Sequence, residues 1–364
     1  MTKKKEVSGP GSFYELLHVH PLAAPEVIDA AYKTLRGSAK PGLFFKTGDK
    51  DLVARLDGAY EVLSDPGKRT EYDEHLRGTT EGKPIGNYRL VKKISEGGFA
   101  ETYLAEHIDL KTPACIKLIL PRESRITPED VRILENEAQA IWDLRHHALP
   151  AMREFHRLPD GSAALVMSYI PGPTLEQMAE DEDGNRTPLH PELVCRITDR
   201  VLDGLRYLHY HGVVHGDVKP SNIIVKENSP TVVLVDYGLS LVRPTRKDAA
   251  IGYTEAFASP EHQSGLPLLP ESDFYSLGLT MIYALGGDLK RRRVPTATPD
   301  PLTEFIRGLI VHDVTARPNW EKMDLLKELG DVREKSFGRR RSNNATLLDS
   351  YVATDGKKQR RSKP

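Results

Sequence analysis

The sequence predicts an α+β protein with two folded parts: a small all-α module, and then a larger domain that starts with β-strands and continues with helices. Three observations predict this order. Apolar residues recur with helical spacing between positions 28 and 63, short β-type segments follow between 88 and 117, and longer helical segments come after 191. The chain has 364 residues, 39% of them hydrophobic, which is enough for two packed parts.

The first part is expected at residues 12–77, after a disordered segment at 1–11 and before a polar linker at 78–84. Two apolar stripes with helical spacing predict two helices that face each other across a loop. Ser64-Asp65-Pro66-Gly67 ends the second helix, because proline and glycine interrupt helices. The stripes consist of Ile28, Ala31, Tyr32 and Leu35, and of Val53, Leu56, Tyr60 and Leu63.

The second part, residues 85–330, begins with short segments of β character. Tyr88–Ile94 and Thr102–Leu104 are typical of paired strands around a glycine-containing turn, and Ala114–Lys117 ends another β-type run. A helical face follows, on which Glu137 stands four and seven residues before Ile141 and Leu144. Further helices are expected from about 191, at 281–285 and at 302–310.

Two polar segments are the most informative feature of this second part. His215-Gly216-Asp217-Val218-Lys219-Pro220-Ser221-Asn222 is followed by Asp236-Tyr237-Gly238 in a predicted strand-loop-strand unit. A carboxylate, a lysine and two oxygen-bearing metal ligands in one such unit are what phosphoryl transfer requires. The segments resemble the catalytic loop and the metal-binding turn of protein kinases.

Other segments match the same family in its own order, from about Ile85 to Leu329. Ile94-Ser95-Glu96-Gly97-Gly98-Phe99-Ala100 resembles the phosphate-covering loop, although Ser95 and Ala100 stand where the family has glycines. The remaining matches are Lys117 on the third strand, Glu137 on the C helix with Glu135 as the alternative, Met167 and Tyr169 at the hinge, Ser259-Pro260-Glu261, Asp273 and Arg317.

This resemblance implies a bilobal protein-kinase-like fold, with a small β-rich N lobe and a larger helical C lobe. It implies ATP and Mg²⁺ as cofactors, Asp217 as the catalytic base with Lys219 beside it, and Asn222 and Asp236 as metal ligands. The residues implied at the nucleotide are Ser95, Gly97, Gly98, Ala100, Lys117, Glu137, Met167 and Tyr169.

Lys219 is typical of the serine/threonine branch of the family, so the implied acceptor is a serine or threonine hydroxyl of a protein substrate. Thr254 stands where that branch has a threonine that bonds the catalytic aspartate and lysine. Gly216 departs from the family, which usually has an arginine before the catalytic aspartate. Without that guanidinium, a phosphorylated activation segment lacks its main bidentate partner.

The helical module resembles a J domain through several short segments. They are Phe13-Tyr14-Glu15-Leu16-Leu17, Ala30-Ala31-Tyr32, Ala59-Tyr60-Glu61-Val62-Leu63-Ser64-Asp65-Pro66, Arg69 and Tyr72-Asp73. The family's His-Pro-Asp tripeptide falls on Lys40-Pro41-Gly42, which lacks the imidazole and the carboxylate. The resemblance therefore implies a degenerate J domain that does not stimulate a chaperone ATPase. We expect its remaining use to be protein contact, either against the kinase lobe or with an outside partner.

Composition sets the remaining expectations. The net charge of −1 indicates no general affinity for nucleic acid, and no apolar run approaches a membrane span, so we expect a cytoplasmic protein. Cys115 and Cys195 are predicted to be reduced core residues. Residues 331–364, rich in Lys and Arg, are predicted to be a disordered tail, either simply solvated or bound to an acidic partner such as nucleic acid, a membrane surface or an acidic substrate.

Two other functions compete with an active kinase. A catalytically weak pseudokinase scaffold is favoured by Ser95 and Ala100 in the glycine loop, and a chaperone adaptor is suggested by the J-like module. The joint presence of six kinase-type residues favours the enzyme, and the substitution of the His-Pro-Asp tripeptide argues against the adaptor. The six residues are Lys117, Glu137, Asp217, Lys219, Asn222 and Asp236.

Overall fold

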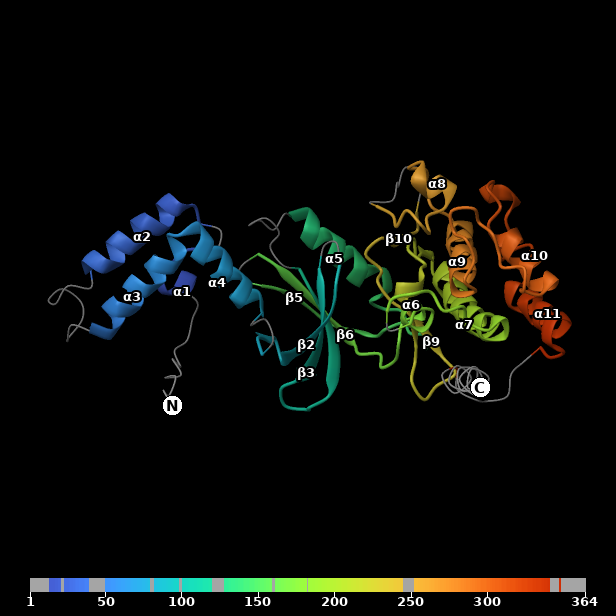
Figure 1. Cartoon of the computed structure of the whole chain (residues 1–364), viewed down its shortest axis with the longest axis horizontal. Coiled ribbons are helices and arrows are strands. Elements are labelled where there is room, and N and C mark those ends of the chain that lie inside the picture. Colours follow the sequence, from blue (N-terminus) through green and yellow to red (C-terminus); the bar gives the residue numbers. More distant parts are fainter. Residues whose placement is uncertain are drawn as a thin grey trace. The chain divides into compact units, whose positions relative to one another are not determined.

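The structure is a computed structural model (Figure 1). It describes residues 13–20, 23–38, 50–78, 82–97, 100–119, 128–158, 161–181, 183–244, 252–340 and 347. Within these ranges, none of the helices combines the length and the apolar character that crossing a bilayer requires.

The N-terminal module contains the two predicted helices and two more. Helices α2 (Pro25–Ser38) and α3 (Lys50–Leu63) correspond to the apolar stripes, while α1 (Phe13–Leu16) precedes them and α4 (Pro66–Gly78) follows. The predicted stop at 64–67 is confirmed as the end of α3, but Pro66 also begins α4, because proline is well suited to a first helical turn. The core of the module consists of Tyr14, Leu17, Ile28, Leu56, Ala59 and Leu63.

Paired aromatic and charged side chains join these helices. The rings of Tyr32 and Tyr60 stack at 4.0 Å, and each hydroxyl donates to an aspartate of the opposite helix, Asp57 and Asp29 respectively. Tyr14 donates to Asp73 at 2.6 Å; burial, together with this carboxylate, raises the pKa of Tyr14 to about 12. Long-range pairs of this kind hold the hairpin in one register.

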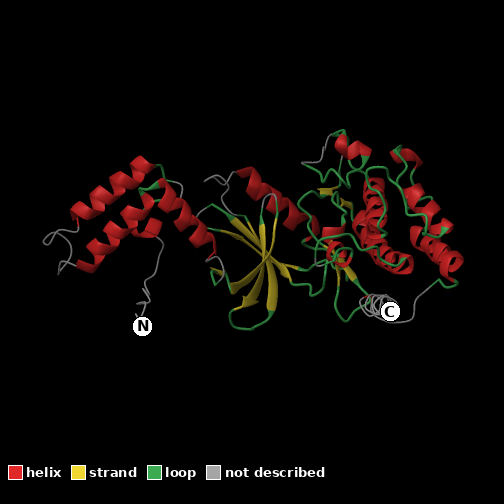
Figure 2. Cartoon of the chain, in the orientation of Figure 1, coloured by secondary structure: helices red, strands yellow, loops and turns green. Residues whose placement is uncertain are grey.

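The β-rich region consists of a six-stranded sheet in the order β1-β2-β3-β4-β6-β5. The predicted strand pair is confirmed as β2 and β3, which run antiparallel and are longer than expected. Figure 2 shows these strands in yellow. The bounds are β1 Pro84–Ile85, β2 Tyr88–Glu96, β3 Glu101–His107, β4 Pro113–Leu118, β5 Met152–Arg157 and β6 Ala163–Ser168.

Helix α5 (Pro128–Ile141) carries Glu137. The sequence predicted one helical face running as far as Leu144, but the helix ends at Ile141. The Leu144 N–H donates to the Ile141 carbonyl in a turn, and this contact replaces the next helical hydrogen bond. Residues 113–115, 129–155 and 165–364 belong to one compact unit, so α5 is grouped with the helices that follow.

The remainder of this unit is mainly helical, and α9 lies at its centre, since every residue from Ser272 to Ala284 is buried. The helices are α6 (Leu175–Met178), α7 (Pro191–Tyr210), α8 (Pro260–Gln263), α9 (Pro270–Ala284), α10 (Asp300–Leu309) and α11 (Leu325–Phe337). The short strands are β7 (Val213–Val214), β8 (Ile223–Val225), β9 (Val232–Leu234) and β10 (Leu241–Val242).

The predicted start of a disordered tail at residue 331 is wrong, because α11 continues to Phe337. Arg333 is buried within it, and the helix ends at Gly338 in the left-handed conformation that glycine favours. Beyond the helix, Arg339 makes two 2.7 Å hydrogen bonds to Glu192 on α7, and Arg340 pairs with Glu334. The basic cluster 357–361 lies outside the described residues.

Candidate active site

The predicted catalytic loop lies between two short antiparallel ladders. Strand β7 precedes it and pairs with β10, and strand β8 follows it and pairs with β9. A 3-10 turn at Pro220–Asn222 leads from the loop into β8. Both ends of the loop are therefore fixed by backbone hydrogen bonds, which limits how far the polar residues between them can move.

The carboxylate of Asp217 is held from three sides by residues that the sequence singled out. Its Oδ2 lies 2.7 Å from Lys219 Nζ and accepts from Asn222 Nδ2 at 3.0 Å, while its Oδ1 accepts from the Thr254 hydroxyl at 2.8 Å. Lys219 also donates to Thr254 at 2.9 Å, so the predicted contacts of Thr254 with both residues are confirmed. Asp217 is 7% exposed, so the carboxylate has a fixed orientation in a nearly dry site.

The two predicted metal ligands are brought together by the β8–β9 hairpin. The Val235 N–H donates to the Asn222 carbonyl at 3.0 Å, which places Asp236 one residue beyond the pair. Both amide hydrogens of Asn222 are directed to Asp217, leaving its side-chain oxygen as the ligand atom. An amide oxygen beside a carboxylate is a donor set that fits Mg²⁺.

Asp236 has a backbone φ of +67°, an unusual value for a residue with a side chain. Gly238 follows two residues later and donates its N–H toward Asp236 Oδ1 at 3.5 Å. A Cβ on Gly238 would lie 3.5 Å from that oxygen and 3.7 Å from Glu137 Oε2. A Cβ at Gly238 would therefore make only ordinary contacts, and the strain of this turn lies in the positive φ of Asp236.

Glu137 reaches this turn from α5. Its side chain is 1% exposed, and Oε1 accepts from the Tyr237 N–H at 3.2 Å. The structure thus brings Glu137 to the residue next to Asp236, a contact that spans 100 positions of sequence. The ring of Tyr237 is buried and lies 4.8 Å from that of His215, which joins the turn to the catalytic loop.

Asp273, near the start of α9, holds the predicted catalytic loop through hydrogen bonds. Its carboxylate accepts from the N–H groups of His215 and Gly216 and lies within hydrogen-bonding distance of His209 Nε2, each at 2.8 Å. Burial opposes ionisation of Asp273, but the contact with His209 and the backbone donors outweighs it and lowers the pKa of the carboxyl. The anchor is therefore an anion at neutral pH.

Sequence reasoning missed the continuation of this anchor. The indole N–H of Trp320 donates to His209 Nδ1 at 2.8 Å, so the other ring nitrogen carries the hydrogen and donates to Asp273. The side chain of His209 is 2% exposed. Nothing in the sequence pairs Trp320 with His209, which lies 111 positions earlier. The only hint was weak: His209 stands next to the apolar face predicted for the long helix that became α7.

Gly216 has a φ of +76°, and a Cβ added to it would lie 2.7 Å from the Leu239 carbonyl oxygen. The loop therefore accepts only glycine at this position without a backbone shift. This is a physical reason for the departure from the usual arginine that the sequence alone did not provide.

The residues predicted to contact the nucleotide lie on the six-stranded sheet and directly after strand β6. Ser95 pairs with Thr102 across β2 and β3, Gly97 donates to the Ala100 carbonyl at 2.9 Å in the connecting turn, and Lys117 is half-buried on β4. Gly98 lies outside the described residues. Met167 is buried on β6, and Tyr169 follows that strand and is half-buried.

The predicted pair of Glu261 and Arg317 is present and buried. The two guanidinium nitrogens Nη1 and Nη2 donate to the two carboxylate oxygens at 2.7 and 2.8 Å. Arg317 also donates to the carbonyls of Val311, Glu271 and His312, so all five N–H groups have acceptors. This pair fixes the end of the segment that carries Thr254.

A family model described as protein kinase domain matches residues 88–324. The chain belongs to this family. Its β-rich first lobe and helical second lobe agree with the bilobal fold that the resemblance implied. The kinase match begins after the helical module, so it does not test the resemblance of that module to a J domain.

Several relatives are named serine/threonine-protein kinases, and three of them are described next. Serine/threonine-protein kinase D of Synechocystis sp. is 30% identical over 218 residues, which are 55% of this chain and 41% of that protein. PrkC of Bacillus subtilis is 30% identical over 57% of this chain and 31% of its own length, and pkn3 of Myxococcus xanthus is 30% identical over 57% and 39%. The chain therefore spans less than half the length of each of these relatives.

Proposed function

We propose that the protein is an ATP- and magnesium-dependent kinase that phosphorylates serine or threonine hydroxyls of protein substrates. The observation that carries this proposal is the arrangement around Asp217, where Lys219, Asn222 and Thr254 hold one carboxylate in a fixed orientation. The family match and the names of the relatives support it.

In this mechanism Asp217 orients the substrate hydroxyl and accepts its proton, while Lys219 neutralises charge beside it. Asn222 and Asp236 would hold Mg²⁺, which supplies electrostatic stabilisation of the phosphate groups when bound. Lys117, Met167 and the turn at 95–100 would bind the nucleotide. Glu137 positions the metal-binding turn through the N–H of Tyr237.

Transfer of label from γ-labelled ATP tests the proposal, with the purified chain alone and with a cell lysate as the source of protein substrates. Asp217→Asn should lower the rate about 10²- to 10⁴-fold while nucleotide affinity stays nearly unchanged, because only the proton acceptor is lost. Asp236→Asn should weaken metal-dependent nucleotide binding as well. Asp183→Asn, the same change at an exposed turn, is the matched control and should leave both unchanged.

Labelling that depends on Mg²⁺ and disappears in Asp217→Asn supports an active enzyme. Wild-type chain that labels no protein, with or without Mg²⁺, would contradict it and favour the pseudokinase scaffold suggested by Ser95 and Ala100. A lysate alone can contribute other kinases, so the comparison between wild type and Asp217→Asn decides the result.

We further propose that the helical module is a degenerate J domain that docks a protein partner. The crossed tyrosine-aspartate contacts of α2 and α3, and the contacts of Tyr14 with Arg69 and Asp73, support a stably folded module. The predicted loss of co-chaperone activity rests on Lys40-Pro41-Gly42, which lies outside the described residues.

The proposal of a second, acidic partner concerns the C-terminal tail. It is restricted to the basic residues beyond 340, because Arg339 and Arg340 already pair with glutamates.

A further inference from the structure

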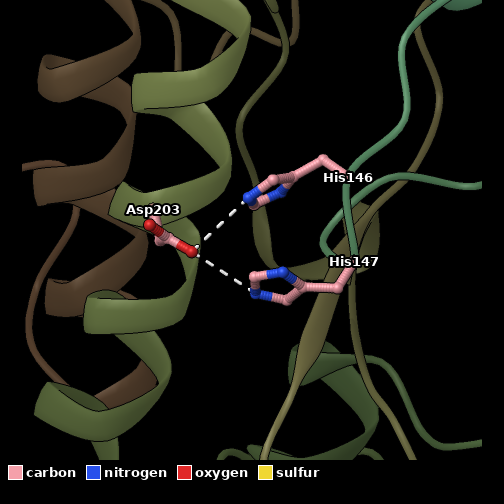
Figure 3. Close-up of side chains that lie close together, drawn as sticks. All are labelled: His146, His147 and Asp203. Atoms are coloured by element: carbon pink, nitrogen blue, oxygen red, sulfur yellow. Dashed lines mark ion pairs between the residues drawn. The ribbon is translucent and has the colours of Figure 1, made fainter.

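Three side chains of types that can bind a metal ion, none of them assigned to the proposed active site, lie close together. His146 and His147 lie in the segment between α5 and β5, and Asp203 lies on α7 (Figure 3). Nε2 of His146 is 3.6 Å and Nε2 of His147 is 3.3 Å from Asp203 Oδ2, and the three ligand atoms lie within 4.8 Å of one another. Both imidazoles point toward the same carboxylate oxygen, as Figure 3 shows.

The two nitrogen–oxygen distances to Asp203 suit a small tetrahedral cation. Ligand atoms at about 2.0–2.1 Å from a tetrahedral Zn²⁺ are roughly 3.3 Å from one another, close to the two separations to Asp203. Two imidazole nitrogens and one carboxylate oxygen form a set that zinc accepts, with a fourth position left for water. We propose that His146, His147 and Asp203 bind one divalent cation of the zinc class.

The two carboxylate oxygens of Asp203 have different partners: Oδ1 contacts Arg206, and Oδ2 faces the two histidines. Arg206 Nη2 holds Oδ1 at 3.0 Å, which orients the carboxylate and leaves Oδ2 facing the imidazoles. The side chains of His146 and Asp203 are 16% and 24% exposed, whereas that of His147 is 52% exposed. The site is thus partly built into the protein and open to solvent on one side, so an ion can enter without unfolding.

Binding has an identifiable cost at His146. An Nε2 lone pair requires the hydrogen to sit on Nδ1, but Nδ1 now accepts from the Ala148 N–H at 3.3 Å. That bond is at the long end of the range for N–H donors and is weak. The ring keeps its orientation without it, because it stacks on Tyr207 with the centroids 4.6 Å apart.

A bound ion would join the segment after α5 to α7 by coordination bonds. The two are already linked where the Arg145 N–H donates to the Tyr207 hydroxyl at 3.1 Å. Since the ion binds the folded arrangement and not the unfolded chain, it should stabilise this unit whether or not the protein transfers phosphate.

Zinc titration of the chelator-treated full-length chain tests the proposal, followed by calorimetry and by thermal melting. One equivalent of Zn²⁺ should bind, and saturating Zn²⁺ should raise the melting temperature by about 5 °C or more. Co²⁺ should bind with the visible absorption of a four-coordinate ion. Millimolar Mg²⁺ should not compete, because it prefers oxygen ligands.

Variants assign the ion to these residues. His147→Ala, at an exposed position, and Asp203→Asn should each raise the Kd for Zn²⁺ at least about 100-fold, since a lost ligand costs more than a lost outer contact. His211→Ala is the matched control: its imidazole packs on the same Tyr207 but lies outside the cluster, so the Kd should not change.

Wild-type chain that binds Zn²⁺ no more tightly than His147→Ala would overturn the proposal. Equally, unchanged stoichiometry and affinity in the double variant His147→Ala/Asp203→Asn would place the ion elsewhere. Neither result bears on the label-transfer experiment with Asp217→Asn, so failure of this site and failure of the kinase proposal are distinguishable.

Discussion

Replacing Arg317 by methionine should lower the free energy of unfolding of the C-terminal unit by about 3–5 kcal/mol. The substitution keeps most of the side-chain volume but leaves the Glu261 carboxylate buried without its cation. The exposed fractions of the two side chains are 0% and 7%, so water cannot replace the lost donors. The same change also leaves the carbonyls of Val311 and His312 without these hydrogen bonds.

The pKa of Glu261 gives a second estimate of the magnitude. Burial would raise this pKa, but the hydrogen bonds from Arg317 and Ser272 outweigh it and lower the pKa from 4.5 to about 2. A difference of this size corresponds to about 3 kcal/mol of stability, in agreement with the mutational range. Because the folded-state pKa is the lower one, this contribution is complete above pH 4.5 and is lost as the pH falls toward 2.

Urea unfolding followed by tryptophan fluorescence measures the effect. The chain has two tryptophans, Trp142 and Trp320, and both lie in this unit, so the signal reports its unfolding. Arg339→Met is the matched control, since Arg339 also makes a two-pronged contact with a glutamate but is 53% exposed. Exposed ion pairs contribute little, so that variant should unfold almost like the wild type.

Two results would refute this reasoning. One is an Arg317→Met variant whose stability at pH 7 is indistinguishable from that of Arg339→Met. The other concerns Glu261→Gln, which removes the titrating group: the stability difference between wild type and this variant should shrink as the pH falls from 4.5 toward 2. A difference that stays constant over that interval would show that the carboxylate is not preferentially ionised in the folded protein.

Gly216→Ala should lower turnover at least about tenfold, measured as label transfer, because the Cβ would meet the Leu239 carbonyl at 2.7 Å in a left-handed backbone; an unchanged rate would show that the loop adapts easily. Trp320→Phe should lower kcat a few-fold with an unchanged KM for ATP, since it frees Nδ1 of His209 but leaves the nucleotide residues intact. An increase in KM alone would contradict this positioning role. Residues 1–80 added to a heat-shock chaperone should leave its ATPase rate unchanged, and clear stimulation would refute the inactive J domain. Deletion of residues 1–80 should change the set of bound partners or substrates, and an unchanged set would remove the docking role.

The core of the candidate site could be predicted because its residues are close in sequence. Asp217, Lys219 and Asn222 lie within six positions, and one loop with a 3-10 turn is enough to bring them together. Thr254 was predicted from its place in the family's order, and its hydroxyl does contact Asp217. Contacts between residues so close in sequence can be predicted without knowing how the rest of the chain packs.

Contacts that depend on tertiary packing were not predictable in the same way. In the sequence, Trp320 is an ordinary aromatic residue and His209 an ordinary histidine in a helix. Their connection becomes visible only in the folded protein, where His209 bonds both Trp320 and Asp273 of α9. The extension of α11 was missed because lysines and arginines near the terminus suggested a solvated tail. Burial of Arg333 shows that a charged residue at that position can belong to a helix face packed against the protein.

The contacts of Thr254 suggest how the site is held without a phosphorylated activation segment. Its hydroxyl donates to Asp217 and accepts from Lys219, so the segment is already tied to the two proposed catalytic residues in the unmodified chain. A phosphate on Thr254 would put a dianion where a hydroxyl now lies 2.8 Å from a carboxylate, which like charges oppose. Lys219 already pairs with Asp217, and Gly216 supplies no further cation to offset that charge. Phosphatase-treated enzyme should therefore keep its initial rate, and a tenfold loss reversed by rephosphorylation would show that another cation, such as Arg243, serves in place of the missing arginine.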